Sequence, residues 1–349
     1  MTVARLVVAR ARASVGLLTA AAVLLLAAAS VVTAGAAFAE TQATAGLRRA
    51  VAQLPPEAVV TTARARQAQD PAAQDAAVRE QVRRLAAQAP VTVSRSTRGG
   101  LTDVLEPASA AAAGLRVVPH AYDDLPAHAD LVAGRWQSAP AEASLHADAA
   151  RALGVEPGDR LVLQGRDGAV GVDVVGTWRP REPADPFFAG DPLETTGTES
   201  PTVAGPLVVD AEAVGLDARP SVRWRVAPDA ASLRPEHLPG LSAVSAGLRA
   251  AVTGDPRVGS DAAVSGDAAA AVADLSRRVG TARSVAALPV AVVAALAGAT
   301  LLLVARLLAA ARERETVLVR SRGASAGQVA GWTTAEGLGL AVPAALLAP

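Results

Sequence analysis

Two long stretches without a charged residue constrain this chain more than any other feature of its 349 residues. Ala13–Ala39 is 27 residues long, Ser284–Ala305 is 22 residues long, and neither contains Asp, Glu, Lys or Arg. At about 1.5 Å of rise per helical residue, each can cross a hydrocarbon core of roughly 30 Å. Backbone groups in such a core find no water, so a lone apolar segment there has to be helical. We therefore expect two transmembrane helices, at residues 13–39 and 284–305.

The arginines beside these stretches predict which side of the membrane each end faces. Three arginines precede the first stretch and five follow the second, where only two acidic residues accompany them. Short cytoplasmic flanks carry an excess of positive charge, so we expect residues 1–12 and 306–328 in the cytoplasm. Residues 40–283 carry 25 arginines and 30 acidic residues, without such a bias. This segment is expected to be a large extracytoplasmic domain held by a membrane helix at each end.

The first stretch has a second interpretation, as a cleaved signal peptide. It follows a basic start, and Ala37-Phe38-Ala39 before Glu40 resembles the small-residue site at which signal peptides are cut. The apolar run is about twice as long as the usual stretch of about 7–15 residues. This length favours a retained anchor, and with either interpretation the second stretch keeps the chain in the cell membrane.

A third apolar segment occupies residues 329–349 and contains one charge, Glu336. We expect it to be the start of a third transmembrane helix that is cut short, as in a truncated or split multi-pass protein.

Composition excludes several classes of protein. All 33 basic residues are arginines, so the chain lacks the lysine of a Walker A loop and cannot hydrolyse ATP by that route. They balance 33 acidic residues, and a formal net charge of zero argues against a nucleic-acid partner. The lack of cysteine removes thiolate nucleophiles and thiolate metal sites, and four scattered histidines leave little for a histidine metal site. We expect no catalytic residues, no cofactor and no bound metal.

Between the two uncharged stretches, helical and strand patterns alternate. Pro71–Ala89 is rich in good helix formers, and apolar residues at helical spacing in Ala143–Leu153 predict a second helix that ends at Gly154. A further helical segment begins at Asp267 and leads directly into the second uncharged stretch. We expect an α+β domain with a small β-rich part, in which a hairpin turns at Arg166-Asp167-Gly168. Strands are expected at Val91–Ser96, Leu115–Val118, Arg160–Gln164, Val170–Trp178, Pro206–Val209 and Ser221–Val226.

One segment, Pro183–Pro201, is dense in Pro, Gly, Asp, Glu and Thr and is expected to be a surface loop. It contains Phe187 and Phe188. Adjacent phenylalanines on such a loop usually pack against their own domain, and the alternative is a contact with a partner or substrate, as exposed apolar patches can be.

Two combinations of histidine and aspartate are the only ones that suggest a hydrolytic or metal site. His146 is close in sequence to Asp148, and His120 is close to Asp123 and Asp124. No third ligand or nucleophile lies at a sequence spacing typical of such a site, so a structural or surface histidine is the favoured interpretation.

A string near the C-terminus, Arg312–Leu340, resembles the signature of FtsX-like permeases, the membrane subunits of MacB-type ABC transporters. The signature combines a charged helix, a Leu-x-Arg-x-Arg-Gly-Ala-Ser turn, a Gln-Val pair and a Glu about eight residues later. The matching residues are Glu315, Leu318, Arg320, Arg322, Gly323, Ala324, Ser325, Gln328, Val329 and Glu336.

A second resemblance lies between the uncharged stretches. Three segments are similar to the external core domain of actinobacterial members of this family. They are Gly134-Arg135-Trp136, Ala152–Leu163 and Val174–Phe188. The resemblance implies an α+β extracytoplasmic domain of MacB-like periplasmic core type, flanked by transmembrane helices.

Membership of this family implies a permease subunit that is not itself an ATPase. Its role would be mechanotransmission, in which ATP hydrolysis by a separate cytoplasmic ABC ATPase moves the extracytoplasmic domain and drives export or extraction of a substrate. The implied assembly is a homodimer or a pair of permeases in membrane lipid. The alternative, also found among relatives of FtsX, is a non-transporting, membrane-anchored module that regulates a cell-wall hydrolase.

By the same resemblance, residues 306–328 form a coupling segment that the ATPase contacts. Gly323 allows a backbone turn that a residue with a Cβ would resist. Glu336 lies in an apolar segment, where acidic side chains are energetically costly and tend to be functional. The alternatives are plain anchoring of the arginines to anionic headgroups and a Glu336 that reaches water at the interface. The residues assigned to ATPase coupling are Arg312, Glu313, Arg314, Glu315, Leu318, Arg320, Arg322, Gly323, Gln328 and Glu336.

Overall fold

A computed structural model describes residues 15–106, 112–213, 220–311 and 327. The chain divides into two compact units, one made of Met1–Ala45 with Arg278–Pro349 and the other of Gly46–Arg277.

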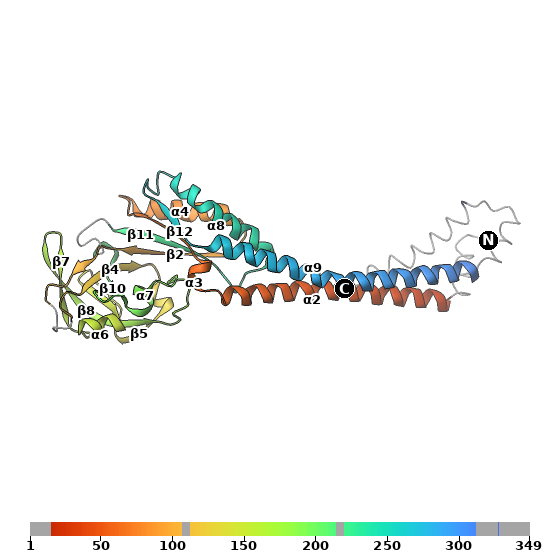
Figure 1. The fold of residues 1–349 in the computed structure, drawn as a ribbon, viewed down its shortest axis with the longest axis horizontal. Helices are drawn as coiled ribbons and strands as arrows, with labels where there is room; N and C mark the ends of the chain where they lie inside the picture. Colours follow the sequence, from red (N-terminus) through yellow and green to blue (C-terminus); the bar gives the residue numbers. More distant parts are fainter. Residues whose placement is uncertain (1–14, 107–111, 214–219, 312–326, 328–349) are drawn as a thin grey trace. The chain divides into compact units, whose positions relative to one another are not determined.

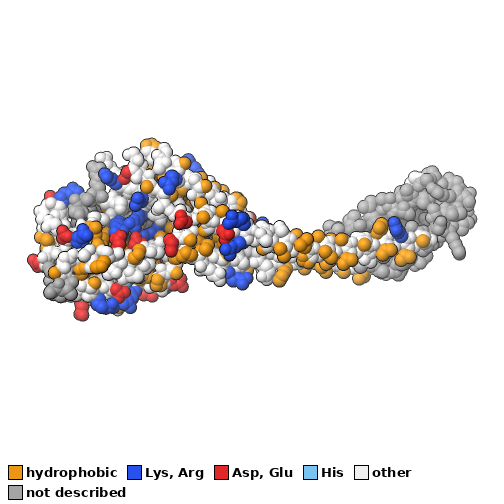
Figure 2. All heavy atoms as spheres, viewed as in Figure 1, with side chains coloured by type: hydrophobic (Ala, Val, Ile, Leu, Met, Phe, Trp, Pro, Cys, Tyr) orange, Lys and Arg blue, Asp and Glu red, His pale blue; other side chains and the backbone are white. Residues whose placement is uncertain are grey.

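In the first unit, the described residues other than Gly327 belong to two long helices, α2 (Val15–Ala52) and α9 (Ala268–Ala311), whose remaining residues belong to the second unit. Both predicted spans therefore fall within helices, from residue 15 onward. Among the described residues, one helix is long and apolar enough to cross a membrane, and it is α9. Its most apolar window has a mean hydropathy of 2.4 and no buried residue, and Figure 2 shows hydrophobic side chains along the visible face of these helices.

Two contacts set how α2 and α9 pair. Glu40 accepts a hydrogen bond from Arg283 at 2.9 Å, and a Cβ on Gly35 would lie 3.1 Å from Cγ2 of Val290. As the position in α2 falls from 40 to 35, the position in α9 rises from 283 to 290, so the helices run antiparallel. An antiparallel pair is the arrangement that two spans with both outer flanks on one side of a membrane require.

The second unit is built on one mixed sheet of 12 strands, with the order β12-β1-β11-β2-β4-β10-β6-β8-β5 and with β3, β7 and β9 pairing beside this path. Most pairs are antiparallel, but β4 with β10 and β6 with β8 are parallel. The strands are β1 (Thr61–Arg66), β2 (Val91–Arg98), β3 (Thr102–Asp103), β4 (Arg116–Tyr122), β5 (Ala129–Gly134), β6 (Glu142–His146), β7 (Arg160–Gly165), β8 (Gly168–Pro180), β9 (Thr198–Ser200), β10 (Val203–Val208), β11 (Ser221–Pro228) and β12 (Ala263–Ser265).

Two helices cover one face of this sheet, α4 (Pro71–Ala86) and α8 (Leu238–Thr253), which lie above β11 and β2 in Figure 1. Asp70 caps α4 by accepting from Ala73 N at 2.9 Å, as expected of an acidic residue just before the first turn. On the covered face of β11, Trp224 is fully buried and donates from Nε1 to Asp75 of α4 at 2.8 Å. The shorter helices are α3 (Pro56–Val59), α5 (Leu125–His128), α6 (Ala147–Leu153), α7 (Pro192–Thr196), η2 (Ala211–Ala213) and η3 (Pro235–His237).

A second core lies where β4, β6, β8 and β10 meet α6. Its fully buried residues include Leu145, Leu163, Val174 and Leu207. The strands around it join the same sheet as β11 and β2, so the β-rich part expected from the sequence is not a separate subdomain.

The structure confirms most predicted elements and corrects two. The hairpin of β7 and β8 turns between Gly165 and Gly168, as expected. Ala143–Leu153, however, is not one helix, because residues 142–146 form β6 and only residues 147–153 are helical. The helix does end at Gly154, which has a left-handed φ of 71°.

The second correction concerns Pro183–Pro201, which is more than a surface loop. It contains α7 and β9, and β9 pairs with β10. At the level of a mixed protein of helices and one large sheet, the predicted fold class is thus confirmed.

Candidate functional site

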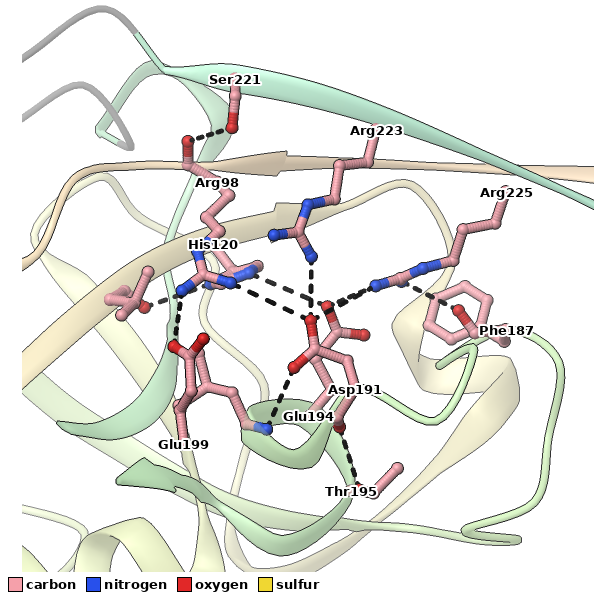
Figure 3. Close-up of polar contacts among 12 residues, drawn as sticks. Arg98, His120, Phe187, Asp191, Glu194, Thr195, Glu199, Ser221, Arg223 and Arg225 are labelled. Carbon is pink, nitrogen blue, oxygen red and sulfur yellow. Dashed lines mark hydrogen bonds and ion pairs between the residues drawn. The ribbon is translucent and has the colours of Figure 1, made fainter. Parts of the chain in front are cut away.

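The most concentrated group of buried charges lies where α7 packs against the sheet. We call it the arginine–carboxylate cluster and define it as Arg98 of β2, Arg223 and Arg225 of β11, and Asp191 and Glu194 at α7. In Figure 3 the arginine side chains point from the strands toward the two carboxylates.

Strand geometry puts these arginines on one face. Successive side chains of a strand point to opposite faces, so Arg223 and Arg225 share a face while Trp224 points to the other, under α4. The carboxylates are presented by the start of α7, where Asp191 is the N-cap and accepts from Leu193 N at 3.1 Å. Glu194 follows in the first turn and faces the sheet.

The ion pairs are short and directional. Arg225 donates to Glu194 Oε1 at 2.7 Å and to the carbonyl oxygen of Phe187 at 2.9 Å. Arg223 donates to Asp191 Oδ2 at 2.9 Å, and an Arg98 nitrogen lies 3.9 Å from the same oxygen. Arg98 also donates to Glu199 of β9 at 2.8 Å. These contacts tie β9 and α7 to β2 and β11.

Burial makes these pairs energetically important. The side chain of Glu194 is 0% exposed and that of Arg225 is 4% exposed. Burial raises the pKa of Glu194, and Arg225 opposes this shift. Burial alone would raise the pKa of Asp191, but the positive charges of Arg223 and Arg225 have the larger effect. The pKa of Asp191 is therefore lowered. Removing one partner of a buried pair leaves a charge that nothing compensates.

His120 of β4 completes the polar interior. It is fully buried, its Nδ1 lies 3.2 Å from the carbonyl oxygen of Val118, and its Nε2 lies 3.8 Å from Glu194 Oε1. Burial, together with the charge of Arg98, lowers the pKa of His120 from 6.5 to about 3. The imidazole is therefore neutral at physiological pH. Neither its Nε2 nor Glu194 Oε2 has a hydrogen-bond partner among the residues that the structure describes.

A neutral buried histidine leads to a prediction about pH. Between pH 6.5 and about 3, the unfolded chain binds a proton at His120 that the folded chain does not, so stability falls as the pH falls through this window. When the pH falls from 7 to 5, the free energy of unfolding of His120→Gln is expected to fall by about 2 kcal/mol less than that of the wild type. The reason is that each pKa unit is worth about 1.4 kcal/mol. Urea unfolding of the full chain in detergent, followed by tryptophan fluorescence, measures this difference. Equal losses in both proteins would contradict it.

The cluster is suited to holding structure together rather than to chemistry on a substrate. Each arginine is engaged by a carboxylate, and the buried histidine is neutral. Among the described residues, no group of three or more His, Asp or Glu is arranged to hold a metal ion. We therefore regard the cluster as a clamp that fixes the segment around α7 to β2 and β11.

The residues predicted from the sequence have different fates. The residues assigned to ATPase coupling all lie outside the described part of the chain. They are Arg312, Glu313, Arg314, Glu315, Leu318, Arg320, Arg322, Gly323, Gln328 and Glu336. Phe187 and Phe188 are 6% and 0% exposed and pack with Trp178, with the Trp178 and Phe188 rings 6.4 Å apart. Their packing is that of core residues, which is the interpretation that the sequence favours, and the alternative contact with a partner or substrate stays a prediction.

The suspected histidine–aspartate combinations do not form sites. His146 is 1% exposed, and its Nδ1 accepts from Asp148 N at 3.2 Å, so it caps α6. His120 does not meet Asp123, whose carboxylate lies instead 3.4 Å from Arg79 and 3.8 Å from Arg95. The acidic neighbour of His120 is Glu194, which is distant in sequence.

Sequence reasoning missed the cluster. One signal was present: Arg223-x-Arg225 places two arginines on the same face of a strand in which Val222, Trp224 and Val226 are apolar, and a buried pair of arginines requires acidic partners. The sequence does not show that Asp191 and Glu194 are those partners, because the segment that carries them is rich in Pro and Gly.

Comparison with known proteins does not supply a family. No protein-family model matches the chain, and no curated protein matches it. The resemblance to FtsX-like permeases therefore stays a prediction that rests on the sequence strings given above.

Proposed function

We propose that this chain is a permease-type membrane subunit, with an extracytoplasmic domain of MacB-like type, that works with a separate cytoplasmic ABC ATPase. It would convert ATP hydrolysis by that partner into movement of residues 46–277 and so promote export or extraction of a substrate. As a multi-pass protein of the cell membrane, it would pair with a second permease subunit.

The observation that supports this proposal most is the composition of α9. Its first residues, including Val272 and Leu275, are buried with the core of the sheet unit. Beyond Ser284 the same helix is uncharged to Ala305, and the large side chains of Leu288, Leu296 and Leu303 are exposed. Exposed leucines over several turns are unfavourable in water and favourable in lipid. One helix therefore packs within the sheet unit at its start and carries a surface suited to a bilayer farther on.

Topology is the first test. The chain has no cysteine, so a single introduced cysteine reports on its own location. Asp167→Cys, in the exposed β7–β8 turn, is expected to react with a membrane-impermeant maleimide in intact cells, whereas Ser321→Cys should react only after the cells are permeabilised. Labelling of Ser321→Cys but not of Asp167→Cys in intact cells would reverse the topology and remove the proposal.

Partnership is the second test. Glu315→Ala and Arg320→Ala change residues that the resemblance assigns to the ATPase contact, and each is expected to lower co-purification of an ABC ATPase subunit about tenfold, as loss of a central interface residue does. Arg64→Ala, an exposed arginine of β1, is the matched control and should leave recovery unchanged. Wild-type recovery with both coupling variants would contradict the proposed partnership.

A further inference from the structure

Three buried polar atoms at the arginine–carboxylate cluster have no hydrogen-bond partner among the residues that the structure describes. They are Nε2 of His120, the hydroxyl oxygen of Tyr122 and Oε2 of Glu194. An unpaired polar atom in a protein interior keeps the full cost of leaving water, so such atoms are rare in native proteins. Where several of them converge, they indicate a bound molecule that pairs with them.

The three atoms converge on one side of the sheet. His120 and Tyr122 are two residues apart in β4, so their side chains share a face, and their rings stack with centroids 5.6 Å apart. Glu194 faces them from α7, with Oε1 3.8 Å from Nε2 of His120, which is too long for a direct hydrogen bond. Burial raises the pKa of Tyr122, and the negative charge of Glu194 raises it further. The carboxylate of Glu194 therefore lies near both rings.

The hydrogen-bonding role of each atom follows from its other contacts. Nδ1 of His120 lies 3.2 Å from the carbonyl oxygen of Val118, which can only accept, so Nδ1 carries the ring proton and Nε2 is an acceptor. Oε1 of Glu194 accepts from Arg225 at 2.7 Å, which favours the ionised carboxylate and leaves Oε2 as a second acceptor. The raised pKa keeps the proton on the Tyr122 hydroxyl, which can therefore donate. A molecule between these atoms has to donate twice and accept once.

From this balance of donors and acceptors, we propose that the cluster holds an internal water molecule, which donates to Nε2 of His120 and Oε2 of Glu194 and accepts from the hydroxyl of Tyr122. Water buried in proteins makes about three hydrogen bonds, the number available here. An anion such as chloride has no proton to give to either acceptor. A metal cation would be repelled by the arginines of the cluster, which together with burial already keep His120 neutral. Water meets all three requirements.

This water adds β4 to the elements that hold α7. The direct ion pairs join α7 to β11, and the water joins Glu194 of the same helix to His120 and Tyr122. It also supplies the hydrogen bond that keeps the second oxygen of a buried carboxylate stable in its ionised form. Every residue of the water site belongs to the sheet unit, so the inference holds or fails independently of the proposed transport function.

A structure of the full chain in detergent, at a resolution that shows ordered water, tests the site directly. One isolated oxygen peak is expected at about 2.6–3.2 Å from each of the three atoms. Three results would overturn the proposal: a direct hydrogen bond between Tyr122 and Glu194, side chains that close on one another with no peak between them, and a metal or chloride ion in place of water.

The variant Tyr122→Phe tests the same site through stability, because it removes the hydroxyl and keeps the ring. If the hydroxyl donates to a water, its loss should raise the unfolding equilibrium constant of the full chain about fivefold in urea. If the hydroxyl has no partner, its removal relieves an unpaired buried group and leaves the constant unchanged or lower, which would contradict the proposal. The control Thr198→Val removes an exposed hydroxyl from β9 and should change the constant by less than roughly twofold.

Discussion

Replacing Arg225 with alanine is expected to lower the free energy of unfolding by about 3–5 kcal/mol. Glu194, which is completely buried, would lose its 2.7 Å ion pair, and the Phe187 carbonyl would lose its donor. The loss is large because a buried carboxylate without its partner keeps its desolvation cost and gains nothing in return. Urea unfolding of the full chain in detergent measures it, with buried Trp178 and Trp224 as fluorescent reporters.

The matched control for this prediction is Arg64→Ala on the neighbouring strand β1. Arg64 is exposed, so its removal should change stability by less than about 0.5 kcal/mol. Combining Arg225→Met with Glu194→Gln should cost clearly less than the sum of the two single changes, since each single change leaves a partner unpaired. Additive costs, or a loss below about 1 kcal/mol for Arg225→Ala, would show that the clamp does not hold α7 to the sheet.

Replacing Gly240 with alanine is expected to cost about 3 kcal/mol, near the upper end of the usual range for overpacking. Gly240 lies in α8, where a Cβ would clash with the backbone carbonyl oxygen of Ala86 at the end of α4. A backbone atom cannot move aside without shifting the helix, so α4 and α8 would have to separate. Thermal unfolding of the full chain should show the loss as a lower Tm.

Gly247 provides the comparison within the same helix, two turns later. A Cβ there would lie 2.9 Å from Cδ2 of Leu85, the flexible end of a side chain that can rotate away. Because alanine is favoured over glycine in a helix by about 1 kcal/mol, Gly247→Ala should be neutral or slightly stabilising. If both substitutions have the same effect, the close approach at Gly240 does not determine how α4 and α8 pack.

Local patterns in the sequence predict the elements of this fold better than their arrangement. The β7–β8 hairpin follows from the turn signal Arg166-Asp167-Gly168, and α4 from its content of good helix formers. The strand β6 was mistaken for helix because Ala143, Ser144 and Leu145 are all buried, and a strand buried on both faces has no alternating pattern to distinguish it. The strand order depends on contacts between distant residues, which a pattern within one segment does not contain.

For the candidate site too, the sequence predicts local features better than contacts between distant residues. The sequence indicates that Arg223 and Arg225 share a face, but their partners come from a segment whose Pro and Gly content predicts a loop. His120 was considered with the aspartates next to it in the chain, whereas the fold places it beside Glu194. Proximity in sequence was a poor guide here, because β4 directs the side chain of His120 into the interior while Asp123 remains exposed after the strand ends.

The position of β1 has a consequence for biosynthesis. In the finished sheet β1 lies between β11 and β12, so both of its neighbours are made after residue 220. While the ribosome completes the middle of the domain, β1 has neither hydrogen-bonding partner that it will have in the end. Closing loops of this size slows folding, and open strand edges invite pairing with other chains. In a nascent copy of this protein the first strand therefore has neither of its final partners until β11, residues 221–228, has been synthesised.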